Sequence, residues 1–218
     1  MTKPAVSVWD LPTRLFHWLL VILIALSWWS AETRTMEWHY RSGLAILGLV
    51  VFRVIWGFIG GSTARFASFV RLPGAALSYL RGQAQDKAGH NPLGGYSVIL
   101  LLAVIAAQVS GGLFASDTDG LESGPMSFLV SYEQSRAITE WHEAGFNLLL
   151  ALIGLHVLAI LFYRFIRRRN LVTPMVTGRD AELPAGTPGL VAAGPVRFII
   201  AAAIGAGTAW AASKGFFL

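Results

Sequence analysis

Five apolar stretches, each close to the length that crosses a lipid bilayer, constrain the fold of this chain more than any other feature of its sequence. A membrane-spanning helix needs about 20 consecutive, mostly apolar residues. The stretches run over Leu15–Ser30, Ser42–Gly60, Gly94–Ala115, Phe146–Phe165 and Phe198–Phe217. Tryptophans lie near several of their ends, as is usual at a membrane–water interface. The pattern predicts an all-α integral membrane protein.

The composition also favours a lipid-exposed surface. Of the 218 residues, 55% are hydrophobic and 13% are charged, whereas soluble domains carry about 25% charged residues. The absence of cysteine excludes disulfides, thiolate-ligated iron–sulfur clusters and covalent attachment of haem to cysteine. The first apolar stretch has no clear small-residue cleavage site, so we expect a retained helix rather than a signal peptide.

The lysines and arginines predict which side of the membrane each loop faces. With the N-terminus inside, thirteen of the 17 basic residues fall on the inner side, as the positive-inside rule requires. The inner residues are Lys3, Arg14, Arg53, Arg65, Arg71, Arg81, Lys87, Arg164, Arg167, Arg168, Arg169, Arg179 and Arg197. Because the net charge of +5 is divided by membrane side in this way, nucleic acid is not expected as a partner.

Four histidines lie near the ends of three of these stretches. His142 and His156 are fourteen residues apart, which in a helix corresponds to a rotation of about 1400° and a rise of about 21 Å. Both therefore lie on one helix face, separated by most of the ~30 Å hydrocarbon core. In the predicted topology, His17 and His156 lie near the inner face, and His39 and His142 lie near the outer face.

Two pairs of imidazoles at matched depths favour two haems, because each pair could supply both axial nitrogens to one iron. Gly43, one turn after His39, would allow close approach of a flat ring. Arg53 is expected on the same helix face at the depth of the inner pair, where a buried arginine needs an anion such as a propionate. Arg14 or Arg41 could act similarly. A metal-ion site and a proton relay through the imidazoles stay open as alternatives, although no three or four zinc ligands share one depth.

Four stretches of the sequence carry a resemblance to a known family: WDLPTRLFHWLL, EWHYRSGLAILGLVVFRVIWGF, GHNPLGGYSVILLL and WHEAGFNLLLALIGLHVLAILFYR. Together they cover about residues 8–180, and the combination of RLFHW with WHE and GLH at this spacing is specific. The chain resembles the bacterial cytochrome b561 family, which includes the related b-type cytochrome subunits of nickel–iron hydrogenases.

The resemblance implies a four-helix transmembrane bundle that holds two non-covalent b haems. The implied iron ligands are the pairs His17/His156 and His39/His142. The implied function is electron transport in a bacterial inner membrane, between the quinone pool and a periplasmic partner such as a c-type cytochrome, with quinone oxidoreductase activity possible. An alternative is the membrane anchor and cytochrome b subunit of a hydrogenase or another periplasmic dehydrogenase. A second alternative, from another class, is a histidine-relay transporter or proton-conducting bundle.

The family core has four helices, and this chain adds a fifth. We expect a di-haem cytochrome b domain over residues 1–180, followed by a linker and an additional transmembrane helix over residues 181–218. The prolines between Thr173 and Gly194 are typical of a linker. Ala203, Gly207 and Ala211 have the small-xxx-small spacing of packed membrane helices. The fifth helix is therefore expected either to fill the same bundle or to contact another subunit or a second copy.

Three further features of the loops carry predictions. A short interfacial helix is expected from Pro73, which suits a first helical turn. His90 is expected either to bond at a helix entry or to form a polar wall for a quinone head or a propionate. The acidic residues between Asp117 and Glu143 form either a solvated loop or a docking face for a redox partner.

Overall fold

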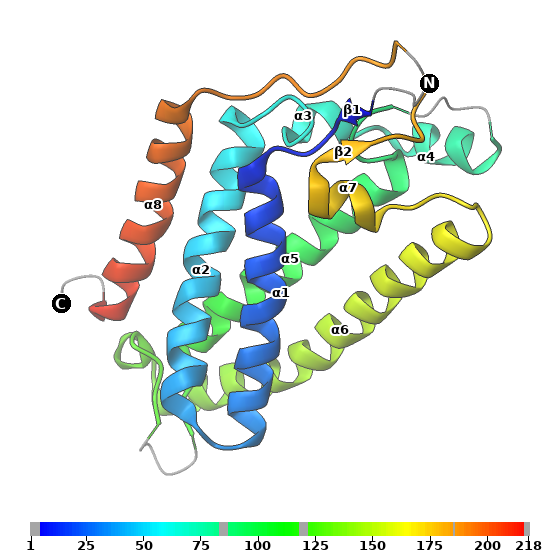
Figure 1. Ribbon diagram of the computed structural model, residues 1–218. Helices are drawn as coiled ribbons and strands as arrows, with labels where there is room; N and C mark the ends of the chain where they lie inside the picture. Colours follow the sequence, from blue (N-terminus) through cyan, green and yellow to red (C-terminus); the bar gives the residue numbers. More distant parts are fainter. Residues whose placement is uncertain (1–4, 83–86, 118–121, 185, 216–218) are drawn as a thin grey trace. The chain divides into compact units, whose positions relative to one another are not determined.

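The computed structural model describes residues 5–82, 87–117, 122–184 and 186–215 (Figure 1). Within them, five helices are long and apolar enough to cross a membrane: α1 (Leu11–Glu32), α2 (Met36–Ile59), α5 (Pro92–Phe114), α6 (Tyr132–Phe165) and α8 (Pro195–Ser213). They coincide with the five predicted stretches and confirm an all-α, multi-span membrane protein. Lys3 and the predicted end of the last stretch at Phe217 lie outside the described residues.

The other described elements are short. They are β1 (Val6–Ser7), α3 (Phe66–Phe69), α4 (Pro73–Leu80), a 3-10 turn η1 (Ser127–Leu129), α7 (Val172–Thr177) and β2 (Arg179–Asp180). The interfacial helix predicted from Pro73 is present as α4, with the proline in its first turn. A proline is tolerated there because its missing N–H would have no helical partner.

Large apolar side chains of the long helices remain exposed. Ile22, Leu155 and Ile199 each expose about three-fifths of their surface. In a soluble protein such a surface would be costly, whereas in a bilayer it contacts acyl chains. The helix α2 is the most buried of the five.

The helix α6 begins earlier than the apolar pattern indicates. It starts at Tyr132, whereas the apolar stretch starts at Phe146. Ser131 and Gln134 explain the difference, because they form a reciprocal capping box. The Gln134 backbone N–H donates to Ser131 Oγ (3.2 Å), and the Ser131 N–H donates to Gln134 Oε1 (2.9 Å). His142 therefore lies inside a continuous helix and not at its end.

The chain forms two compact units, each made of three segments. Unit 1 comprises Met1–Phe16, Arg53–Leu100 and Ile153–Ile199. Unit 2 comprises His17–Phe52, Leu101–Leu152 and Ile200–Leu218. The two predicted histidine pairs are distributed differently over these units. His39 and His142 both belong to unit 2, whereas His17 belongs to unit 2 and His156 to unit 1.

In unit 1 the segment predicted as a linker contains ordered structure. The strands β1 and β2 pair antiparallel, with Val6 opposite Asp180 (Figure 1). Leu183 packs against Val8 and Trp9 in a small buried cluster. The prediction of a plain linker from Thr173 to Gly194 is therefore wrong for its first part. Proline spacing indicated a break in the helix, but it carried no signal for pairing with the distant N-terminal strand.

Asp10 connects the start of α1 to the end of α2 within unit 1. Its Oδ1 accepts from the backbone N–H of Thr13 (2.9 Å), which caps α1. Its Oδ2 accepts from Trp56 Nε1 (3.1 Å), and Trp56 is only 1% exposed. A buried carboxylate is tolerated when both of its oxygens are bonded in this way.

In unit 2 the fifth long helix packs against α2 through small residues (Figure 1). A Cβ built on Gly205 would lie 2.5 Å from the backbone oxygen of Gly48, so only glycine fits there. Ala201 and Ala212 are buried along the same face of α8. Ala203 and Gly207 of the predicted stripe are instead exposed. The small residues that pack are therefore not the three that the sequence pattern indicated.

Candidate functional site

The rings of His39 of α2 and His142 of α6 lie close together in unit 2. Their ring centres are 6.1 Å apart, and the ring planes cross at 87°. A metal–imidazole bond of about 2.0 Å plus about 1.1 Å from nitrogen to ring centre puts two axial imidazoles about 6.2 Å apart. The two ring centres therefore lie at about the separation that one iron held between two imidazoles needs.

Hydrogen bonds fix which nitrogen of each ring is available. Nδ1 of His39 donates to the backbone oxygen of Ser27 (2.9 Å), and Nδ1 of His142 donates to the backbone oxygen of Gln108 (3.0 Å). A carbonyl oxygen can only accept, so both Nδ1 atoms carry the hydrogen and both Nε2 atoms keep a lone pair. This is the usual arrangement of metal-binding histidines, whose second nitrogen is held by an outer partner.

Gln108 of α5 holds His142 from a second direction. Its side-chain Nε2 donates to the backbone oxygen of His142 at 2.6 Å. Two glycines make room for this contact. A Cβ on Gly145 would lie 2.7 Å from Gln108 Oε1, and a Cβ on Gly112 would lie 3.1 Å from His142 Cε1. The helices α5 and α6 can approach closely at this point because both positions lack a side chain.

A cavity of about 760 Å³ adjoins the two histidines. His39, His142, Gln108 and Gly43 are among the residues that line it. A Cβ on Gly43 would meet no atom within 4 Å, so this glycine faces open space. Cofactor pockets are typically 300–1,000 Å³. The size of the cavity and its two available imidazole nitrogens fit a haem.

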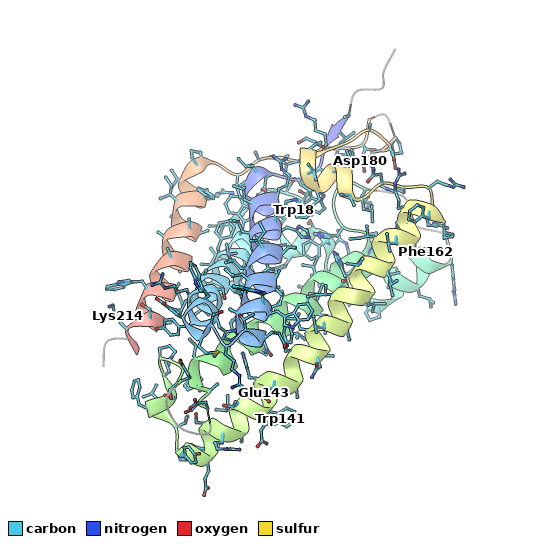
Figure 2. All side chains as sticks on the ribbon, turned by 60° about the horizontal axis from the view of Figure 1, so that its bottom comes forward. Trp18, Trp141, Glu143, Phe162, Asp180 and Lys214 are labelled. Atoms are coloured by element: carbon cyan, nitrogen blue, oxygen red, sulfur yellow. The ribbon has the colours of Figure 1, made fainter. Side chains whose placement is uncertain are left out.

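Charged side chains at the cavity wall are mostly acidic. The acidic lining residues are Glu32, Asp117, Glu122, Glu140 and Glu143. Arg136 also lines the cavity, and its guanidinium lies 3.9 Å from Glu140. Trp141 and Glu143 lie on the same part of α6 (Figure 2). We call these five acidic residues the acidic rim. Their negative charge favours the approach of a partner protein with a basic surface. Residues 118–121 of the predicted acidic loop lie outside the described part.

Arg53 is buried in unit 1 and only 3% exposed. Its guanidinium lies over the rings of Phe16 and Phe66. Among the described residues, its Nη1 has no hydrogen-bond partner. The carboxylate of Asp10 is already bonded to Thr13 and Trp56. A buried guanidinium with an unfilled donor fits an anion such as a propionate.

The other predicted arginines are engaged elsewhere. Arg14 Nη1 donates to the backbone oxygen of Val176. Arg41 pairs with Glu37 on the surface of α2.

His90 occupies an aromatic slot in unit 1. Its ring centre is 4.6 Å from those of Trp9 and Phe69. Burial, together with the positive charge of Arg53, lowers the pKa of His90 to about 3. Within the described residues its Nδ1 has no hydrogen-bond partner. His90 is therefore a neutral imidazole packed between rings, and the helix-entry bond is made by Asn91, whose Oδ1 accepts from Gly94 N–H (2.7 Å).

The second predicted pair is His17 and His156. His17 stacks edge to face with Trp18 on α1. His156 lies on α6 in unit 1, two residues after Gly154, where an added Cβ would meet no atom within 4 Å. The pairing of His17 with His156 is a prediction from sequence position and helix direction.

Sequence reasoning missed Ser27, Gln108 and Arg136. Gln108 did give a signal, because it is a strongly polar side chain within the apolar run of α5. The metal-ion alternative finds no support in the described part of the chain, where no three His, Cys, Asp or Glu side chains are grouped to hold an ion. Zinc usually takes three or four such ligands.

Comparison with known proteins shows which family the sequence resembles. The family model of prokaryotic cytochrome b561 matches residues 8–178. Two relatives, each named a probable Ni/Fe-hydrogenase B-type cytochrome subunit, come from Azotobacter chroococcum mcd 1 and Azotobacter vinelandii. Each is 24% identical over 212 residues, covering 81% of this chain and 88% of the relative. A protein of the same name from Bradyrhizobium diazoefficiens is 18% identical. No solved structure matches the chain.

Proposed function

Because this chain belongs to the prokaryotic cytochrome b561 family and is a membrane b-type cytochrome of electron transport, we propose that it carries electrons through two haems. The route runs between the quinone pool and a redox partner at the outer face of the membrane. The observation that carries the proposal is the geometry of His39 and His142. Two imidazoles at iron-ligating separation, both with Nε2 available, line a cavity of cofactor size.

We assign the outer haem to this pair. Nε2 of each histidine would hold the haem iron, and the backbone oxygens of Ser27 and Gln108 keep the hydrogen of each ring on Nδ1. Such outer partners raise ligand basicity and fix ring orientation. Arg136 is the cation at the cavity wall that can offset a propionate charge.

We assign the inner haem to His17 and His156. The support is the fourteen-residue spacing from His142 to His156, which keeps both ligands on one face of α6. Arg53 supports the same assignment, because a buried guanidinium with an unfilled donor suits a propionate. We therefore propose Arg53 as a cofactor-binding residue in addition to the four histidines.

A bound haem supplies reversible one-electron chemistry, and this chain supplies ligation, spacing and insulation. The apolar helices exclude water from the region between the two histidine levels. The rise of about 21 Å between His142 and His156 sets the spacing across the hydrocarbon core. From the positive-inside pattern we propose that the N-terminus lies in the cytoplasm and that the acidic residues at the cavity wall face the periplasm.

A membrane anchor for a hydrogenase is the second candidate function. It is favoured by the relatives named as hydrogenase cytochrome subunits, which this chain matches over 88% of their length. In both candidates the partner docks at the acidic rim near His142. A periplasmic c-type cytochrome is the partner in the first candidate, and a large catalytic subunit is the partner in the second.

Electron transfer in sealed vesicles tests the proposal. The haem-loaded protein is reconstituted with a lipid-soluble quinol, and the reduced haem band and an external acceptor are followed together. We expect quinol to reduce both haems and the acceptor to oxidise them. His142→Ala should retain reduction of the remaining haem but lose transfer to the acceptor. Fully loaded protein that quinol cannot reduce would refute the quinone route. Co-purification of a large subunit from native membranes would favour the second candidate.

A further inference from the structure

A second cavity, of about 290 Å³, lies in unit 1 and takes no part in the haem assignments. Its lining residues are Tyr79, Tyr163, Ile166, Arg167 and Arg169. Tyr79 comes from α4 and Tyr163 from the last turn of α6, while the other three follow the end of α6 at Phe165. The cavity is therefore formed where the last turn of α4 meets the end of the spanning helix α6.

Two tyrosine hydroxyls are held in place at this cavity by Asn91. The hydroxyl oxygens of Tyr79 and Tyr163 are 2.8 Å apart. Asn91 Nδ2 donates to both of them, at 3.1 and 3.0 Å. The two hydroxyl oxygens and Asn91 Nδ2 thus form a closed triangle of hydrogen bonds. The tyrosine hydroxyls are held in position at the cavity wall by this trio.

The charge of the cavity is positive. Arg169 Nη2 lies 3.5 Å from Asp180 Oδ2, so one carboxylate offsets part of one guanidinium. Arg167 has no carboxylate within ion-pair distance in the described part of the chain, and no acidic residue is among those that line the cavity. Two guanidinium groups and a phenol donor are the groups that bind phosphate oxygens well.

The surroundings of the cavity indicate a lipid phosphate. Ile166 lines the cavity and exposes 68% of its surface, and Phe162 and Phe165, near the end of α6, expose 51% and 65%. Phe162 lies near the C-terminal end of α6 (Figure 2). Apolar side chains at the end of a spanning helix contact acyl chains, while arginines just beyond it lie at headgroup level. A soluble anion would not contact the apolar part of this surface, whereas the acyl chains of a lipid would.

We propose that Tyr163, Arg167 and Arg169, with Tyr79 held by Asn91, bind the phosphate of an anionic phospholipid at the inner membrane face. Basic pockets between membrane helices bind such headgroups. The bound lipid ties α4 to the end of α6, which are connected in the protein itself by the tyrosine pair. The site is independent of haem ligation, and its function is to anchor this end of the protein.

Thermal unfolding of the delipidated, haem-loaded protein in detergent tests the site. The loss of the haem absorption band is followed with added phosphatidylglycerol, phosphatidylcholine or inorganic phosphate at constant ionic strength. We expect phosphatidylglycerol alone to raise the unfolding temperature. Arg167→Gln and Tyr163→Phe should each lose most of that increase. Arg168→Gln is the matched control, because it removes the same charge from a neighbour that does not line the cavity.

Three outcomes would overturn the proposal. Equal stabilisation by phosphatidylcholine would show that the headgroup charge is not recognised. Equal stabilisation by inorganic phosphate alone would show a soluble-anion site. An equal loss in Arg167→Gln and Arg168→Gln would show a diffuse charge effect and no built site. The absorption spectrum before heating confirms that each variant is folded and loaded, and Tyr163→Phe tests the site without changing charge.

Discussion

His142 and Gln108 bind each other in both directions. His142 Nδ1 donates to the backbone oxygen of Gln108 at 3.0 Å, and Gln108 Nε2 donates to the backbone oxygen of His142 at 2.6 Å. A single residue of α5 therefore fixes both the tautomer of the ring and the position of the α6 backbone that carries it. Second partners of this kind commonly change metal affinity by 10–100-fold when removed.

Gln108→Leu should loosen the outer haem without unfolding the protein. Leucine keeps a similar volume but cannot donate to His142, so one hydrogen bond of about 1 kcal/mol is lost while the Nδ1 contact to the backbone remains. We expect release of the outer haem to be about tenfold faster when an excess of apo-globin captures it. Asn147→Leu is the control, since Asn147 lines the cavity and its side chain, in the described part of the chain, bonds the Glu143 backbone and not His142. Equal release rates in the two variants would contradict the role of Gln108.

Gly43→Leu should block the outer haem while the chain still folds. Gly43 faces the cavity, and a Cβ there meets no atom within 4 Å, so a leucine would occupy the space available to the macrocycle. Gly207→Leu is the control. Gly207 lies on the exposed face of α8, where an added Cβ meets no atom within 4 Å, so this variant should bind as much haem as the wild type. Haem per chain after purification is the measurement. Full haem content in Gly43→Leu would show that the macrocycle lies elsewhere.

Arg53→Gln should lower the midpoint potential of the inner haem. Removing a buried positive charge disfavours the reduced form, which carries one more negative charge, and the expected shift is on the order of tens of millivolts. Arg53→Lys keeps the charge and should show a smaller shift. A redox titration followed at the two haem bands gives the result. A shift confined to the haem of His39 and His142 would contradict the placement of Arg53.

The five spans could be predicted from the sequence because hydropathy depends only on local composition, and α6 carries both His142 and His156 as their spacing requires. The apolar run did not indicate that α6 begins at Tyr132, because the Ser131–Gln134 cap is polar and lies outside that run. The pairing of β1 with β2 and the contact of Gly205 with Gly48 depend on residues far apart in the chain, and no local pattern specifies them.

His90 should make the protein less stable as the pH falls below neutral. Its pKa is about 3 in the folded protein and about 6.5 when unfolded. Below pH 6.5 the unfolded chain takes up a proton that the native His90 does not, so acid favours unfolding. The unfolding temperature should drop more between pH 7.5 and 5 in the wild type than in His90→Phe. An equal drop in unfolding temperature in both proteins would show that His90 does not contribute, because the two proteins have all other titratable groups in common.

Haem content of paired histidine variants tests the two-haem arrangement most directly. We predict two b haems per chain in the wild type and in His90→Phe. His39→Ala, His142→Ala and their double variant should each retain one haem, because all three destroy the same site. His142→Ala combined with His156→Ala should retain none. A wild type with one haem, or a double variant of His39 and His142 that loses both, would contradict the arrangement.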